Sequence, residues 1–142
     1  MAIVLDASAT LSWLVNRTNP AEAQLAREVL HALRREDAVV PLLWYAEVTN
    51  GILVAERRQI CNREQSALFL TMLGELTIVD DEKRPAVTQL AMLDLARTYG
   101  LTGYDATYLE LVLRTGCALV TFDRQLADAT RKAGGRVFGD PE

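Results

Sequence analysis

Residues 3–6 read Ile-Val-Leu-Asp, a run of three apolar residues followed at once by a carboxylate. A short apolar run of this kind is typical of a buried β-strand. Similar runs at residues 38–40, 77–79 and 118–121 are predicted strands, and helical patterns separate them. Strands that alternate with helices indicate an α/β fold. We therefore expect a parallel sheet with helices on both faces, in three α/β/α layers.

The segments between these strands carry helical signals. Pro41 suits the first turn of a helix, and Asn62 suits an N-cap. Asp80 or Asp81 is expected to cap a long helix that ends near Gly100. Residues 136–138 are expected to add an edge strand. The expected helices begin at Ser8 and then cover residues 20–35, 41–58, 62–74, 80–99, 102–115 and 126–133.

The bulk composition predicts one globular domain over residues 1–142. Half of the residues are apolar and 24% are charged, which is an ordinary globular balance. The longest apolar runs are far too short to span a membrane, and the N-terminus has no basic region of a signal peptide. Cys61 and Cys117 are scattered, so we expect free thiols and a cytoplasmic protein.

The charged residues give two conflicting indications about partners. A formal net charge of −4 argues, taken alone, against binding to nucleic acid. Basic pairs nevertheless occur, and they are either solvated helix ends or contacts for RNA. With one histidine and two separate cysteines, a Cys/His zinc site is excluded. The basic pairs are Arg34-Arg35, Arg57-Arg58, Lys83-Arg84 and Arg131-Lys132.

Two carboxylates follow predicted strands. Asp6 comes directly after residues 3–5, and Asp123 comes shortly after residues 118–121. Ligands of open α/β sheets bind beyond the carboxyl ends of the strands. Either residue alone is well explained as a helix N-cap or a turn residue. Their corresponding positions at two strand ends favour a shared site.

Two more carboxylates interrupt helix faces. The row Leu43, Glu47, Asn50, Val54 places an acid and an amide on a face that should be apolar. A buried carboxylate is costly unless it is paired or binds a metal, although Glu47 could instead lie at the rim or pair with an arginine. Asp105 similarly begins an apolar row, in a first helical turn where capping is the alternative.

Four carboxylates in one pocket would repel each other, so the cluster makes sense around cations. Oxygen ligands without His or Cys favour Mg²⁺ or Mn²⁺ over zinc. Mg²⁺ keeps several waters, so some of the four acids would act through water. Such a site is suited to hydrolysis of phosphodiester bonds, and its cations would offset the negative charge of the chain.

Four blocks of this sequence resemble the PIN-domain family, and closely its VapC-type toxins of bacterial toxin–antitoxin pairs. By this resemblance, the family's acidic positions fall on Asp6, Glu47, Asp105 and Asp123, and its neighbouring polar positions on Ser8, Asn50 and Thr121. The resemblance implies a Mg²⁺- or Mn²⁺-dependent endoribonuclease that acts on tRNA or rRNA, forms homodimers and is inhibited by a cognate antitoxin. The four blocks are Ile3-Val-Leu-Asp-Ala-Ser-Ala9, residues 41–50, residues 101–111 and residues 119–126.

Three other functions compete with a nuclease. A receiver-like phosphoacceptor domain would carry an acidic pair after its first strand and a lysine at a later strand end. Here Asp6 stands alone, and Arg124 follows Asp123. A phosphatase with an aspartate nucleophile would place a second aspartate where Ser8 stands. A PIN-type scaffold could also bind RNA or protein without cutting it. Residues 57–80 carry no motif that identifies a substrate.

Overall fold

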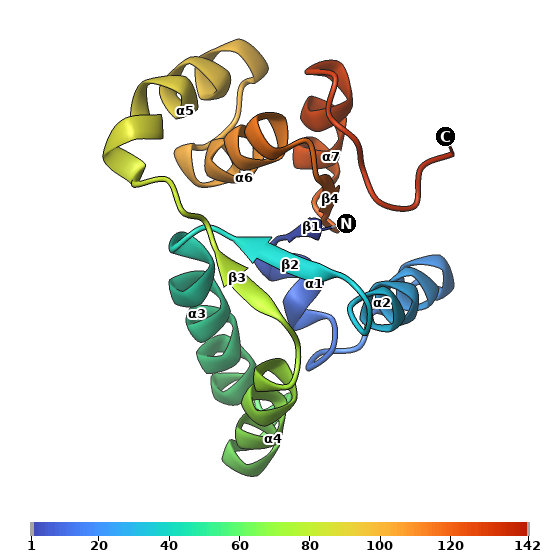
Figure 1. Ribbon diagram of the computed structural model, residues 1–142. Helices are drawn as coiled ribbons and strands as arrows, with labels where there is room; N and C mark the ends of the chain where they lie inside the picture. The colour runs from blue at the N-terminus through green and yellow to red at the C-terminus, as the bar shows by residue number, and fades with distance from the viewer. Residues whose placement is uncertain (1, 142) are drawn as a thin grey trace.

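The computed structural model describes residues 2–141. Within them, one parallel sheet contains four strands in the order β3-β2-β1-β4 (Figure 1). The strands are β1 (Ala2–Leu5), β2 (Asp37–Val40), β3 (Ile78–Asp80) and β4 (Ala118–Val120). Each strand lies where a short apolar run predicted one.

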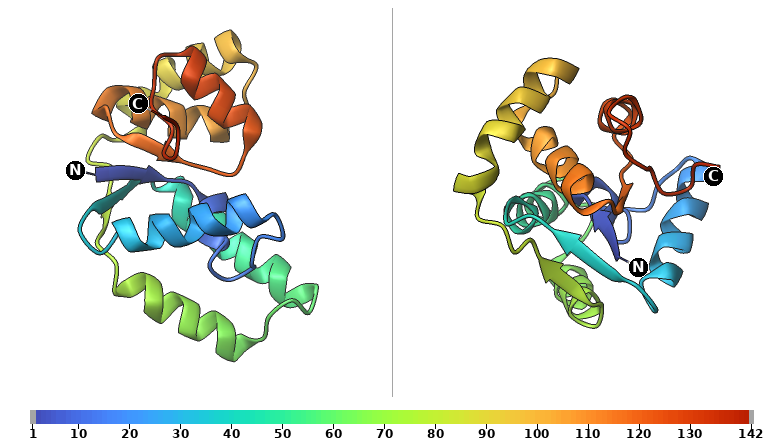
Figure 2. Two further views of the ribbon diagram at one scale, coloured as in Figure 1. Left: turned by 90° about the vertical axis from the view of Figure 1, so that its right-hand side faces the viewer. Right: turned by 45° about the horizontal axis from the view of Figure 1, so that its top comes forward.

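Helices cover both faces of the sheet. In Figures 1 and 2, α1 to α4 lie on one face, and α5, α6 and α7 lie on the other. The predicted three-layer α/β/α architecture is therefore confirmed. The helices are α1 (Ala7–Leu11), α2 (Pro20–Ala32), α3 (Leu43–Arg57), α4 (Arg63–Gly74), α5 (Pro85–Tyr99), α6 (Gly103–Thr115) and α7 (Arg124–Lys132). None of the described helices is long and apolar enough to cross a membrane.

The hydrophobic core centres on β1 and α6. Val4 and Leu5 of β1 are fully enclosed, as is Leu109 of α6. A strand covered on both faces has no polar side, which explains the unbroken apolar run at residues 3–5. Each fully buried side chain of this size stabilises the fold by about 1.5–3 kcal/mol relative to an exposed one.

Local signals set most of the helix ends. Asn62 and Gln65 form the reciprocal hydrogen bonds of a capping box at the start of α4. Gly100 and Gly116 end α5 and α6 with φ angles of 66° and 72°, which a residue without a Cβ adopts at low cost. The predicted cap of α4 and the predicted glycine ends are confirmed.

The predicted start of α5 is wrong. Neither Asp80 nor Asp81 caps it, because the helix begins at Pro85 with Arg84 at the N-cap position. Proline has no N–H to satisfy and its φ is already helical, so it sets the first turn. The Asp81 carboxylate is instead bound by Arg114 at 2.6 Å.

The predicted edge strand at residues 136–138 is also wrong. Val137 makes one isolated parallel bridge with Leu119. Gly134 and Gly139 on either side have φ angles of 87° and 94°, so the chain turns before and after this bridge. The segment is too short between those turns to extend the sheet.

A glycine lets α1 and α3 pack closely. A Cβ on Gly51 would lie 2.2 Å from Cδ1 and 2.8 Å from Cδ2 of Leu11, closer than carbon atoms approach. Gly51 lies one turn after Glu47 on α3, and α1 begins directly after Asp6. This contact therefore lies between the helix that Asp6 caps and the helix that carries Glu47.

Replacing Gly51 tests that contact. We expect Gly51→Ala to lower the free energy of unfolding by about 1–3 kcal/mol, because the added methyl group overpacks the helix interface. In a Leu11→Ala background the same change should cost about 1 kcal/mol less, since the clashing atoms are gone. Urea unfolding of the four proteins measures this coupling. An equal cost in both backgrounds would show that Leu11 does not limit the approach of the helices.

Candidate active site

The candidate site lies where the order of strands reverses. The chain places β2 and then β3 on one side of β1, and later returns to place β4 on the other side. Leu5 and Val120 are partners in the register, and the Asp6 backbone N–H donates to the Val120 carbonyl at 3.1 Å. Such a reversal opens a crevice at the carboxyl ends of the strands. Asp6 and Thr121 stand at its edge.

Asp6 is buried and held by three donors. Its side chain is part of a residue that is only 5% exposed. The Ser8 hydroxyl and the Ala9 backbone N–H each donate to its Oδ1 at 2.8 Å, and the Thr121 hydroxyl donates to its Oδ2. Asp6 therefore caps α1, which is the alternative role that the sequence left open for it. Capping occupies only one of its oxygens, and the other faces β4.

Asp123 is joined to Asp6 through Thr121. The Asp123 backbone N–H donates to the Thr121 hydroxyl oxygen at 2.9 Å, and that hydroxyl donates to Asp6. The Oδ1 atom of Asp123 accepts the Leu126 backbone N–H at 3.0 Å and so caps α7. Its second oxygen is not needed for the cap.

Glu47 reaches the site from the edge of α3. The expected apolar row of this helix was wrongly phased, because the buried face contains Trp44, Val48, Ile52 and Ala55. Glu47 lies beside that face and is half-buried. The Tyr108 hydroxyl donates to its Oε1 at 2.6 Å. Asn50 is exposed, and its expected place beside the acids stays a prediction.

Asp105 lies in the first turn of α6, and capping does not explain it. Thr102 is the N-cap, and its hydroxyl oxygen accepts the Asp105 backbone N–H at 3.1 Å. The Asp105 carboxylate is therefore free of the cap and half-buried. Its pKa is raised, first by burial and then by the negative charges of Asp123 and Glu47.

The four carboxylates act on one another electrostatically. Burial raises the pKa of Asp6 to about 6, against the lowering effect of its three donors, and the charge of Glu47 raises it further. Glu47 also raises the pKa of Asp105, as Asp123 does. Burial and the bond to Glu47 likewise raise the pKa of Tyr108, so its hydroxyl stays protonated. The fold brings all four predicted acids within electrostatic range of their neighbours.

The donor set suits a hard divalent cation. All four charged groups are carboxylates, and oxygen atoms are the ligands that Mg²⁺ and Mn²⁺ prefer. Within residues 2–141, no three His, Cys, Asp or Glu side chains are grouped closely enough to hold an ion directly. Mg²⁺ keeps several of its waters in proteins, so fewer direct ligands and bridging waters fit this arrangement.

Tyr108 is the site residue that the sequence did not reveal. It follows Asp105 by three positions on α6 and belongs to a row of buried residues. A tyrosine in a buried row is itself a signal of a contact, because a buried phenol hydroxyl needs a hydrogen-bond partner.

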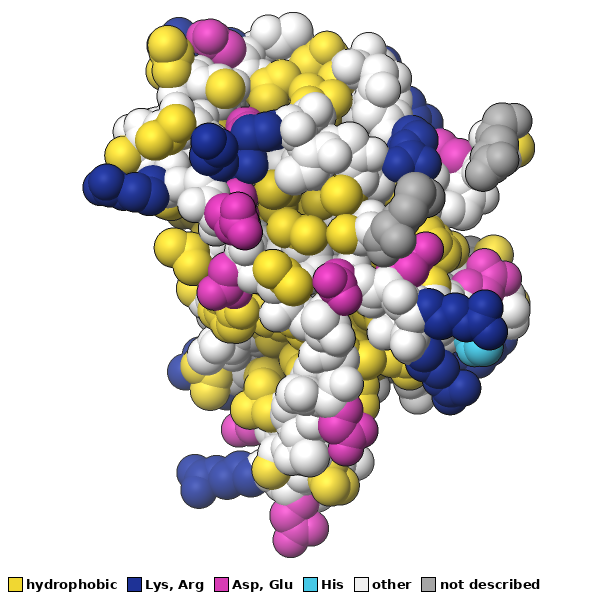
Figure 3. Space-filling view, in the orientation of Figure 1, with side chains coloured by type: hydrophobic (Ala, Val, Ile, Leu, Met, Phe, Trp, Pro, Cys, Tyr) yellow, Lys and Arg dark blue, Asp and Glu magenta, His cyan; other side chains and the backbone are white. Residues whose placement is uncertain are grey.

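The predicted basic pairs are all exposed. In Figure 3, basic side chains gather beside the single histidine, which belongs to α2.

The chain belongs to the PIN-domain family. The family model for the PIN domain matches residues 3–132, which include β2, β3 and β4, all of β1 except Ala2, and all four acids. This membership agrees with the resemblance of the four sequence blocks and with the observed fold.

Several relatives are similar over most of their length. Ribonuclease VapC3 of Pyrobaculum aerophilum is 29% identical over 128 residues, covering 90% of this chain and 94% of the relative. A VapC ribonuclease of Mycobacterium bovis is 31% identical over 131 residues, covering 89% of both chains. Ribonuclease VapC9 of Mycobacterium tuberculosis gives the same figures.

Two solved structures share the fold. PAE2754 from Pyrobaculum aerophilum superposes with a TM-score of 0.62 at 23% identity, over 92% of this chain and 89% of that one. FitAcB from Neisseria gonorrhoeae superposes with a TM-score of 0.63 at 16% identity, over 98% and 97%. At these identities the likeness concerns the arrangement of helices and strands.

The raised pKa of Asp6 predicts how stability depends on pH without metal. A carboxyl whose pKa rises from 3.8 to about 6 on folding stabilises the fold when protonated. That contribution is complete below the unfolded pKa and is lost as pH rises through the folded pKa. We expect metal-free protein to lose up to about 3 kcal/mol between pH ~4 and pH ~7 from this group.

Urea unfolding in EDTA across that range measures the loss. Asp6→Asn removes the titrating group and should flatten the dependence, while Asp94→Asn, at an exposed position of α5, should leave it in place. If wild type and Asp6→Asn have the same slope, burial of Asp6 does not control the pH dependence.

Proposed function

We propose that this chain is a Mg²⁺- or Mn²⁺-dependent endoribonuclease, the toxin of a bacterial toxin–antitoxin pair. The observation that carries the proposal is the repulsion that links the four carboxylates in series, Asp6 with Glu47, Glu47 with Asp105 and Asp105 with Asp123. The relatives that are named ribonucleases support hydrolysis of RNA in particular. We assign catalysis and metal binding to Asp6, Glu47, Asp105 and Asp123.

The differing environments of the acids suggest different roles. Asp6 is the most enclosed, so it suits holding the ion in a fixed place. Ser8 and Thr121 orient its carboxylate through the hydrogen bonds described above. Asp105 is half-exposed and its cap-free carboxylate can face RNA and water. A bound cation supplies the remaining chemistry: it lowers the pKa of a water and offsets charge on the scissile phosphate.

RNA binding is compatible with the net charge of −4. A cation held by the acids would neutralise their charge, and exposed arginines and lysines are available outside the site. We propose tRNA or rRNA as the substrate, and a cytoplasmic location. The free thiols of Cys61 and Cys117 suit that reducing compartment.

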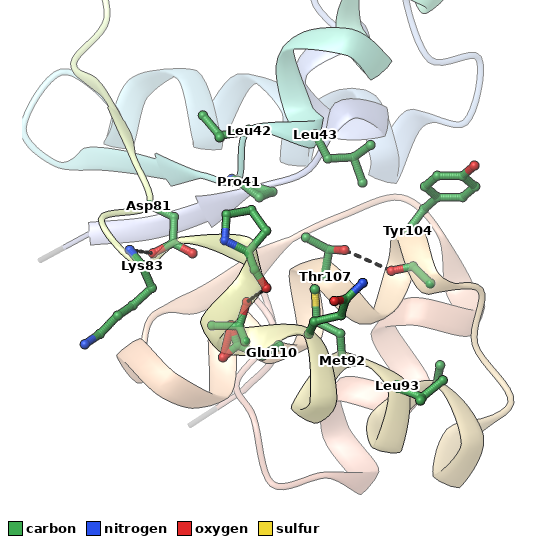
Figure 4. Close-up of a pocket in the computed structure, with 15 residues that line it drawn as sticks. Pro41, Leu42, Leu43, Asp81, Lys83, Met92, Leu93, Tyr104, Thr107 and Glu110 are labelled. Atoms are coloured by element: carbon green, nitrogen blue, oxygen red, sulfur yellow. Dashed lines mark hydrogen bonds between the residues drawn. The ribbon is translucent and has the colours of Figure 1, made fainter.

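We also propose a homodimer and a cognate antitoxin as partners. Support for the homodimer comes from an apolar cavity of about 490 Å³ between α5, α6 and the start of α3 (Figure 4). Leu42 and Leu43 approach it from the N-terminal end of α3, and Met92 and Leu93 approach it from α5. Exposed apolar residues continue from it along α5, with Leu90 69% exposed. Exposed apolar patches of this kind mark interfaces.

Purified protein should cleave RNA only with a divalent metal. Asp105→Asn keeps the size of the side chain and removes the charge that attracts the cation. We expect it to reduce cleavage by on the order of 10²–10³-fold or more, because a catalytic metal contributes several kcal/mol. EDTA should abolish cleavage by the wild type, and Mg²⁺ or Mn²⁺ should restore it.

The matched control is Asp94→Asn, an identical change on the exposed side of α5. It should cleave at the wild-type rate. Wild-type cleavage by Asp105→Asn, in a preparation shown to be free of contaminating nuclease, would contradict the proposed site. A wild-type protein that binds RNA and never cuts it would favour the non-catalytic scaffold.

If the chain forms a homodimer, one substitution in the proposed interface should reduce the mass of the particle measured in solution. Leu93 lines the cavity and is 46% exposed, so Leu93→Glu places a charge in the proposed interface. We expect sedimentation at micromolar concentration to give a dimer for wild type and a monomer for this variant. Leu68→Glu on α4 is the control, since Leu68 is exposed and does not line the cavity. A monomeric wild type would overturn the homodimer.

A further inference from the structure

Arg17 is held in a fixed direction by contacts to two other elements. The residue belongs to the connection between α1 and α2. Its guanidinium carbon lies 4.7 Å from the centre of the Phe122 ring, shortly after β4. Its Nε donates to Oε2 of Glu22 on α2 at 2.7 Å, and its Nη2 lies 2.6 Å from the same oxygen. Because fixing a long side chain costs conformational entropy, this arrangement needs an explanation.

Phe122 places the guanidinium at the edge of the candidate site. Phe122 directly precedes Asp123, and its backbone N–H donates to Oγ of Ser8 at 3.0 Å. The same Ser8 hydroxyl donates to Asp6. Ser8 and Arg17 line one hollow of about 480 Å³. The guanidinium therefore borders the same space as a side chain that orients the most buried acid.

The guanidinium keeps donors for a ligand. Arginine has five N–H groups, and the contacts of Nε and Nη2 both go to a single oxygen of Glu22. Within residues 2–141, Nη1 has no acceptor. The side chain is 35% exposed, so a ligand in solvent can reach it. A planar guanidinium edge of this kind matches the oxygens of a phosphate.

The charge of Arg17 is not used to neutralise the four acids. Its ion pair is with Glu22, outside that cluster. RNA carries one phosphate for each nucleotide, so a strand whose scissile phosphate lies at the acids brings further phosphates past the edge of the site. Those phosphates meet a chain of net charge −4. A cation fixed at this edge would attract them, and it loses little freedom on binding because its direction is already set.

We propose that Arg17 binds a phosphate of the RNA next to the scissile one, with Phe122 and Glu22 fixing the direction of its guanidinium. The inference rests on the proposed function, because it takes RNA as the substrate and the four acids as the place of cleavage. It adds a substrate-binding residue from the α1–α2 connection. The competing explanation is that Arg17 only fastens this connection to its neighbours.

The salt dependence of RNA binding separates the two explanations. Fluorescence anisotropy measures the affinity of wild type and Arg17→Met for a short fluorescein-labelled oligo(U), in EDTA so that no metal-dependent cleavage occurs, from ~50 to ~200 mM salt. We expect Arg17→Met to bind about tenfold more weakly at low salt. The plot of log affinity against log salt should also become shallower by about 0.7, the value of one phosphate contact on a single strand.

Arg97→Met is the matched control, because it removes the same charge from an exposed ion pair with Asp94 on α5. It should keep the slope of the wild type. The proposal is overturned if Arg17→Met also keeps that slope, or if Arg97→Met lowers it equally, because charge at any position would then have the same effect. A wild type without measurable affinity for oligo(U) would overturn it as well.

This result is separable from the proposed function, since binding is measured without metal and cleavage with it. If Arg17→Met keeps the slope while wild type cleaves RNA with Mg²⁺ and Asp105→Asn does not, the nuclease stands and only the role of Arg17 fails. If Arg17→Met lowers the slope but wild type cleaves no RNA with any divalent metal, the proposed catalysis fails and the contact of Arg17 with RNA stands.

A measurement on wild type covers the case in which Arg17→Met does not fold. Phenylglyoxal modifies exposed guanidinium groups, and mass spectrometry of peptides gives the rate at each arginine. Saturating oligo(U) should slow the modification of Arg17 several-fold and leave that of Arg97 unchanged. Modification of Arg17 at the same rate with and without oligo(U) would show that RNA does not cover it, and would overturn the proposal.

Discussion

The pairing of β1 with β4 is the constraint on which the rest of the site depends. It joins residues more than 110 positions apart and brings the Thr121 hydroxyl onto the Asp6 carboxylate. The same hydroxyl accepts the Asp123 backbone N–H, so one threonine fixes two acids relative to each other. Because side chains alternate along a strand, a slip of one residue in this register would turn Thr121 away from Asp6. The register of two buried strands thus determines the geometry of the proposed metal site.

The fold tolerates this site at a cost in stability. Asp6 is a carboxylate in the core, and its raised pKa shows that burial outweighs three hydrogen-bond donors. The negative charge of Glu47 repels the Asp6 carboxylate and raises its pKa further. The elements that hold these acids also contain the most enclosed apolar residues, such as Leu5 of β1 and Leu109 and Val112 of α6. Apolar burial on the same elements offsets the unfavourable charges, so a cluster of acids can persist in a small domain.

The sequence predicted features that follow from local chemistry or from general topology. Asp6 and Asp123 could be placed together because the carboxyl ends of parallel strands share one edge, whatever the detailed packing. Glu47 was selected for a partly wrong reason, because the buried face of α3 contains Trp44, Val48, Ile52 and Ala55 and so is rotated from the expected row. Tyr108 was missed because its acceptor lies 61 positions away, beyond the reach of any periodic pattern. The start of α5 was misplaced because Pro85 set the first turn while Arg114 engaged Asp81.

Helix α6 links the acidic site to the apolar cavity. Its first turn carries Asp105, while Tyr104 and Thr107 on either side of that residue line the cavity (Figure 4). One turn further, Tyr108 points in the other direction, to Glu47. The first turn of α6, which carries Asp105, therefore lies between the acidic site and the apolar cavity. A partner seated in the cavity would press on the same turn of α6 that positions Asp105. The same helix continues into a buried row between Ala106 and Val112, so both environments lie on one element that is anchored in the core.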